Sequence, residues 1–83
     1  MKAPLTSELL GRAGAYQCLA ELERRPFALT HPEILEFVEE YCEAQGEDLL
    51  LNLRDAGVVT QVGREYGLTT LGVRAFVLLV LRP

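Results

Sequence analysis

The chain has 83 residues, of which 49% are hydrophobic and 24% are charged, and its formal net charge is −4. This balance is typical of a single globular domain covering residues 1–83, and it excludes a disordered or low-complexity chain. So short a chain buries only roughly 60–65% of its unfolded surface, and a partner subunit would add stability. The negative charge argues against strong sequence-independent binding to nucleic acid, because such binding needs clustered lysines and arginines.

Several motif classes are missing from the chain. Cys18 and Cys42 lie in helical patterns without metal-ligand spacing, so we expect buried, reduced thiols. The first residues include Glu8 in place of the apolar run of a signal peptide, and Ala75–Leu81 is far too short to span a bilayer. There is no phosphate-cradling glycine loop. We therefore expect a cytoplasmic protein that is not an enzyme and binds no metal, cofactor or membrane.

A first helix is expected from Thr6 or Ser7 to about Arg25, because leucine and alanine recur at three- and four-residue steps. Gly11 and Gly14 lie within this pattern. Each costs a helix on the order of 1 kcal/mol relative to alanine. The two glycines therefore indicate either a frayed start or a close approach by another helix.

A brief strand and a second helix follow. Phe27–Leu29 is an apolar run long enough only for a short strand, which could pair with a later hairpin. Thr30 and Glu33 have capping-box spacing and predict that the helix begins at about His31, itself expected at the surface. Gly46 is expected to end this helix. Its polar face carries a row of carboxylates, which is usually solvated; the row is Glu33, Glu36, Glu39, Glu40 and Glu43.

A third helix and a hairpin come next. The helix is expected from Glu47 to about Ala56, and Gly57 ends it. Val58–Val62 and Tyr66–Thr69 are rich in β-favouring residues. Glycine at the first position of the two-residue turn between them predicts a type II′ turn, with Arg64 at its tip.

The last helix predicts self-association. It begins after Thr69 or Thr70, and its residues are apolar around almost the whole circumference, with only Arg74 and Arg82 interrupting them. Such a helix needs cover on two sides, whereas a chain of 83 residues has one core to offer. We expect a homodimer through this helix and the first one. The expected interface is Val73, Phe76, Val77, Val80, Gly11 and Gly14.

The predicted order of helix, strand, helix, helix, two strands and helix resembles the winged helix-turn-helix domains of small prokaryotic transcriptional regulators. Its fold is mainly α with a small β-hairpin, the wing. The phrases that carry the resemblance are similar to L-R-E-A-G-L-V and Y-x-L-T-x-x-G of the arsenic-repressor-like and multiple-antibiotic-resistance-repressor-like families. They are Leu50, Leu53, Arg54, Asp55, Ala56, Gly57, Val58 and Val59, then Tyr66, Leu68, Thr69, Leu71 and Gly72. No single family is assigned.

The resemblance implies that the third helix and the wing meet DNA, yet the residues expected on the outward face of that helix do not suit this role. They are Glu47, Asp48, Leu49, Leu51 and Asn52. Carboxylates there repel phosphates, unless they only complement the helix dipole. Because Leu49 and Leu51 flank the inward Leu50, at least one of them should meet a partner or the second helix.

Two function classes remain open. The first is a regulatory module that binds protein through Leu49, Leu51, Glu47 and Asp48. The second is a dimeric DNA-binding transcriptional regulator that uses Asn52, Arg54 and Arg64. The acidic surface favours the first class.

Overall fold

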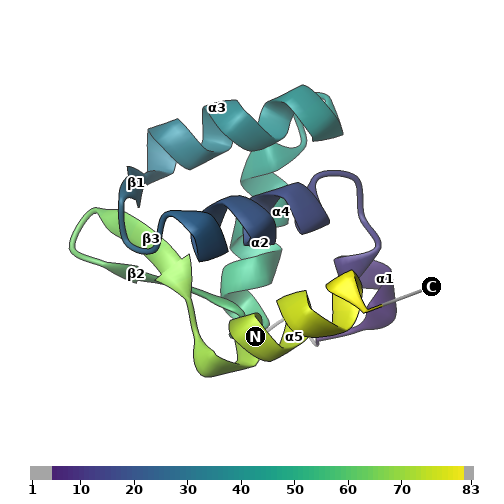
Figure 1. Cartoon of the computed structure of the whole chain (residues 1–83). Helices are drawn as coiled ribbons and strands as arrows, with labels where there is room; N and C mark the ends of the chain where they lie inside the picture. Colours follow the sequence, from purple (N-terminus) through teal and green to yellow (C-terminus); the bar gives the residue numbers. More distant parts are fainter. Residues whose placement is uncertain (1–4, 82–83) are drawn as a thin grey trace.

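Five helices and three short strands form the structure, a computed structural model that describes residues 5–81 (Figure 1). Lys2 and Arg82 lie outside the described residues. In chain order the elements are α1 (Ser7–Leu10), α2 (Ala15–Arg24), β1 (Leu29–Thr30), α3 (His31–Cys42), α4 (Gly46–Asp55), β2 (Val59–Val62), β3 (Glu65–Leu68) and α5 (Thr70–Val80).

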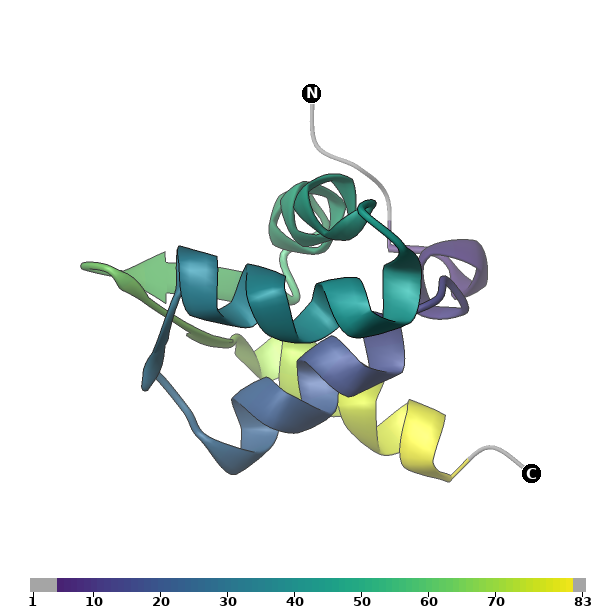
Figure 2. The same cartoon turned by 90° about the horizontal axis from the view of Figure 1, so that it is seen from above.

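Helix α2 lies at the centre of the fold. It contacts α3 on one side, α5 on the other and β3 of the sheet, while α4 packs against α3 and β2. Figures 1 and 2 show the sheet at one end of the helices and α5 on the far side of α2 from α3. The largest fully buried side chains come from α2, α3, α4 and the start of the hairpin. They include Leu19, Leu22, Ile34, Leu49, Leu50, Leu53 and Val58.

The three strands form an antiparallel sheet in the order β1-β3-β2. Leu29 pairs with Tyr66, so the brief strand does join the later hairpin. Val62 and Glu65 pair across the two-residue turn. Gly63 has φ 64° and Arg64 is not among the residues with positive φ, as a type II′ turn requires. The predicted hairpin and its turn glycine are confirmed.

The prediction of one long first helix is wrong. The chain breaks between α1 and α2, and Gly14, with φ 89°, precedes α2 in a left-handed conformation. A Cβ on Gly14 would lie 3.3 Å from Cδ2 of Leu49 and 3.4 Å from Cβ of Cys42. The close approach is therefore made inside the chain. Because Gly14 is buried, it is not available to a second subunit, which corrects its assignment to the dimer interface.

The connection between α3 and α4 also differs from the expectation. Helix α3 ends at Cys42, and Glu43 (φ 47°) and Ala44 (φ 66°) make the left-handed turn that Gly46 was expected to make. Gly46 instead opens α4, one residue before the predicted start. A Cβ on Gly46 would lie 2.9 Å from Cδ1 of Leu35. Gly46 is therefore needed where α3 and α4 cross. The left-handed turn is made instead by Glu43 and Ala44, whose backbones are strained because both carry a Cβ.

Helix α5 begins as expected. The Thr69 hydroxyl accepts a hydrogen bond of 3.0 Å from the Gly72 N–H and donates to the Gly57 carbonyl. Only Gly72 and Ala75 of α5 are buried, although Phe76 and Leu79 also pack against the core. The chain therefore covers one side of this apolar helix and leaves the other side in solvent.

The backbone strain at Ala44, in the turn between α3 and α4, can be tested by substitution. Replacing Ala44 by glycine should raise the free energy of unfolding by about 0.5–1 kcal/mol, because glycine adopts positive φ without a Cβ clash. Urea unfolding measures the change. The control Ala20→Gly, within α2, should lower stability by about 1 kcal/mol. Equal losses in both variants would contradict the left-handed conformation at Ala44.

Candidate functional site

The outward face of α4 is narrower than the sequence predicted. Leu49 is fully buried beside Gly14, so its assignment to a partner-binding surface is wrong. The physical reason is that the α1–α2 connection packs on the side of α4 where Leu49 lies. We define the α4 surface by its exposed or partly exposed outward residues. They are Glu47, Asp48, Leu51, Asn52, Arg54 and Asp55.

Leu51 is the apolar centre of the α4 surface, with 39% of its area exposed. Asp48 and Asp55 precede and follow it by three and four residues, so both carboxylates lie on the same helix face as the leucine. Both aspartates are exposed. The exposed Arg54 also follows Leu51 by three residues, so a partner that covers Leu51 meets a rim that is acidic on balance and contains one cation.

Asp48 and Asn52 are joined to each other and to the α1–α2 connection. Arg12 Nη1 lies 3.0 Å from Asp48 Oδ2. Asn52 Nδ2 donates to the same Oδ2 at 3.1 Å and to the Asp48 carbonyl at 3.0 Å. Reading an adenine edge needs both the donor and the acceptor of an amide. The donor of Asn52 is already engaged within the chain.

Glu47 belongs to a hydrogen-bonded chain that the sequence did not reveal. His31 Nε2 lies 2.8 Å from Glu47 Oε2, and His31 Nδ1 lies 2.6 Å from the Tyr66 hydroxyl. An ionised carboxylate can only accept, so Nε2 donates to Glu47. In the tautomer that carries its one proton on Nε2, the Tyr66 hydroxyl donates to Nδ1. These residues are 16 and 35 positions apart, so no local spacing signals the contact.

The order carboxylate, imidazole and hydroxyl is also found in nucleophilic catalytic triads. Here, however, the hydroxyl belongs to Tyr66, a residue that is only 2% exposed. The chain of bonds instead ties the start of α3 to β3 and α4. It also fixes the Glu47 carboxylate on the α4 surface.

The two arginines proposed for DNA contact take no part in the hydrogen bonds of Glu47, His31 and Tyr66. Arg54 is exposed in the last turn of α4. Arg64 is exposed at the hairpin tip, beside a groove of about 280 Å³ that it lines with Thr30, His31, Pro32 and Gln61. Within residues 5–81, neither arginine forms an ion pair. Both are therefore free to meet an anionic ligand.

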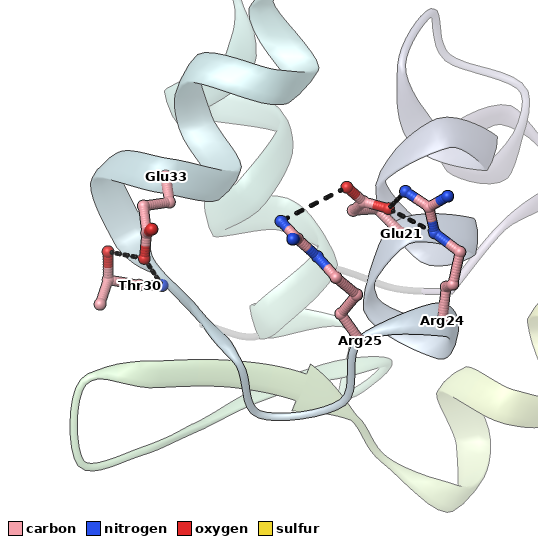
Figure 3. A network of polar contacts seen from close by, with 5 residues as sticks. All are labelled: Glu21, Arg24, Arg25, Thr30 and Glu33. Carbon is pink, nitrogen blue, oxygen red and sulfur yellow. Dashed lines mark hydrogen bonds and ion pairs between the residues drawn. The ribbon is translucent and has the colours of Figure 1, made fainter.

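A second polar network fixes the path from α2 to α3 (Figure 3). The Glu21 side chain, 7% exposed, accepts from Arg24 Nε at 3.0 Å and lies 3.7 Å from Arg25 Nη2. The Thr30 N–H and hydroxyl donate to Glu33 Oε1 at 3.0 and 2.8 Å. The Thr30–Glu33 bonds fit the predicted capping box, whereas the burial of Glu21 was not expected.

Burial limits the reactivity of the Cys18 thiol. Both cysteines are buried, as predicted. Burial, and next the nearby Cys42, raise the pKa of the Cys18 thiol to about 12. Cys42 donates to the Val38 carbonyl at 3.1 Å. Cys18 therefore stays protonated at neutral pH, and thiolate chemistry there is disfavoured.

Residues 5–81 contain neither a cluster of metal-ligand side chains nor a membrane-spanning helix. No three side chains of the metal-binding types gather closely enough to hold an ion. None of the helices in this range has the length and apolar character needed to cross a bilayer.

Comparison with known proteins adds no family assignment. The chain matches no protein-family model, no curated protein and no solved structure. The resemblance to winged-helix regulators therefore stays a proposal, supported by the order of the elements and the geometry of the chain.

The Thr30–Glu33 cap should make stability depend on pH. The Thr30 N–H, then its hydroxyl, and more weakly Arg25, lower the pKa of Glu33 below its ordinary value of 4.5. A lowered folded-state pKa stabilises the fold above the unfolded value, and this contribution is lost as the pH falls through the folded value. Glu33→Gln keeps a capping acceptor. Its unfolding free energy should therefore fall less than that of the wild type between about pH 5 and about pH 3.

Urea unfolding at several pH values measures this difference. Glu36→Gln is the matched control, because it removes a charge from the same helix without touching the cap. If Glu33→Gln and Glu36→Gln change the acid dependence equally, the Thr30–Glu33 bonds are not its cause.

The hydrogen bond between His31 and the Tyr66 hydroxyl should contribute to the stability of the fold. Tyr66→Phe should lower the free energy of unfolding by about 1 kcal/mol, because His31 Nδ1 loses its partner in a partly buried position. Tyr16→Phe is the control, since Tyr16 is exposed and stacks on Phe76 through its ring. Thermal unfolding of both variants gives the comparison, and equal stability of the two would argue against the bond.

Proposed function

We propose that this chain is a non-enzymatic winged-helix regulatory protein that acts by binding another protein through the α4 surface. The element order and the sheet order β1-β3-β2 support the winged-helix part of the proposal. In this assignment α3 and α4 are the helix-turn-helix pair, and the hairpin of β2 and β3 is the wing.

The charge of α3 and α4 is the observation that carries the protein-binding part. Residues 31–55 contain eight carboxylates and one arginine. A DNA-reading helix sits against phosphates, which need cations nearby. Arg12 pairs with one of these carboxylates, Asp48, and the charge of the segment stays negative.

Leu51 is the anchor in this proposal. Interfaces concentrate their affinity in a few apolar side chains surrounded by a polar rim. Leu51 has such a rim in Glu47, Asp48, Arg54 and Asp55, three carboxylates and one guanidinium. The complementary partner surface carries an apolar pocket with basic residues around it.

A DNA-binding regulator is the second candidate. Arg54 and Arg64 favour it, because both are exposed and form no ion pair in the part of the chain that is described. One arginine at a wing tip can meet phosphate or the minor groove. A dimer would present two such wings.

The test separates the two surfaces by mutation. A photo-crosslinking amino acid at position 55, which lies beside Leu51 on the same helix face, captures the partner. The partner is then purified and titrated by calorimetry against the chain with its natural sequence. Leu51→Gln should weaken its binding at least about tenfold, since the apolar anchor is lost. Arg64→Glu, the control, should leave that affinity within about twofold.

DNA binding is measured on the same proteins by anisotropy with a random duplex at low salt. The proposal expects no binding tighter than about 10⁻⁴ M. Salt-sensitive binding that Arg64→Glu abolishes and Leu51→Gln preserves would instead establish the DNA-binding alternative.

A further inference from the structure

We propose that a pocket at the end of α3 binds the guanidinium group of an arginine side chain of the partner. The assignment rests on the proposed function, because the same partner would also cover Leu51. The pocket has a volume of about 310 Å³ and lies where α3, α4 and the α1–α2 connection meet (Figure 2). We call it the Glu43 pocket. Its lining residues are Ala13, Tyr41, Cys42, Glu43 and Gln45.

The charges around the Glu43 pocket favour a cation. Residues 26–53 contain seven carboxylates and no lysine or arginine. Glu43 is exposed, and within residues 5–81 it forms no ion pair. Arg12 precedes Ala13 in the chain, but its Nη1 lies 3.0 Å from Asp48 Oδ2, so its charge is offset there. The Glu43 carboxylate is therefore open to a positive group from outside the chain.

The two helix ends at the pocket act in the same direction. Helix α3 has no basic residue in its last turn, so the partial negative charge of its C-terminal end is not compensated. The N-terminal end of α4 has a partial positive charge, but Glu47 and Asp48 lie in its first turn and compensate it. The negative end of α3 therefore adds to the charge of Glu43.

The side chains of the pocket suit a guanidinium better than an ammonium or a metal ion. The Glu43 carboxylate can accept two parallel N–H bonds, and the Tyr41 ring, on a residue that is 43% exposed, offers a surface for stacking. A lysine ammonium has no plane to stack on Tyr41. The Cys42 thiol is turned inward, where it donates to the Val38 carbonyl. Within residues 5–81, no three metal-ligand side chains gather here.

The Glu43 pocket lies at one end of the α4 surface. Gln45 is the N-cap residue of α4, Asp48 follows it by three residues and Leu51 by six. Six residues of helix cover roughly 9 Å along the axis. A partner helix that lies along α4 would span this distance with two residues seven positions apart, which share one face. One helix can therefore place an apolar residue on Leu51 and an arginine in the pocket.

Two small analogues test the pocket without the partner. Nα-acetyl-arginine methylamide carries the guanidinium on its natural stem, and the citrulline analogue has nearly the same shape without the charge. NMR titration of the isotope-labelled full chain should give a dissociation constant of roughly 1–10 mM for the arginine analogue. The saturating shifts should lie at Ala13, Glu43 and Gln45. The citrulline analogue should bind at least about fivefold more weakly, because it forms no charge-assisted hydrogen bond.

Glu43→Gln should remove the preference for the arginine analogue and change the affinity for the citrulline analogue by less than about twofold. Glu36→Gln is the matched control, because it makes the same change at another exposed position of α3, outside the pocket. It should keep the preference. Circular dichroism melting confirms that both variants fold. Equal affinity of the wild type for the two analogues, or a preference that survives Glu43→Gln, overturns the site.

The purified partner separates a protein arginine from a free guanidinium compound. Glu43→Gln should weaken partner binding at least about fivefold, whereas Glu36→Gln should change it by less than about twofold. If the arginine analogue binds but Glu43→Gln leaves the affinity for the partner unchanged, the partner contact is overturned and the pocket serves a free compound. Failure of the proposed function gives a different result, in which Leu51→Gln does not weaken partner binding while the analogue still binds the Glu43 pocket.

Discussion

The close crossing of α3 over α4 is the contact on which the rest of the structure depends. Gly46 allows it, because a Cβ there would lie 2.9 Å from Cδ1 of Leu35. Gly14 then lets the α1–α2 connection pack on the side of α4, where it covers Leu49 and brings Arg12 to Asp48. These two glycines decide which part of α4 reaches solvent. What remains outward is Leu51 among carboxylates, and the proposed function rests on that surface.

Local chemistry made much of the fold predictable. The Thr30–Glu33 cap, the hairpin turn at Gly63 and the Thr69 cap depend on residues within a few positions of each other, so their spacing in the sequence was sufficient. Features set by distant neighbours were missed. From the sequence alone, Gly46 is expected to end a helix, because its contact with α3 joins residues far apart in the chain. Leu49 is likewise expected on the outward face, because the sequence does not show that the α1–α2 connection covers it.

The candidate site was predictable only in part for the same reason. Composition indicated an acidic α4, and Leu51 is exposed as expected. The bonds of His31 to Glu47 and Tyr66 join residues on three elements, and no motif announces them. Helical periodicity places a residue on a face, but the packing of other elements decides whether that face is exposed.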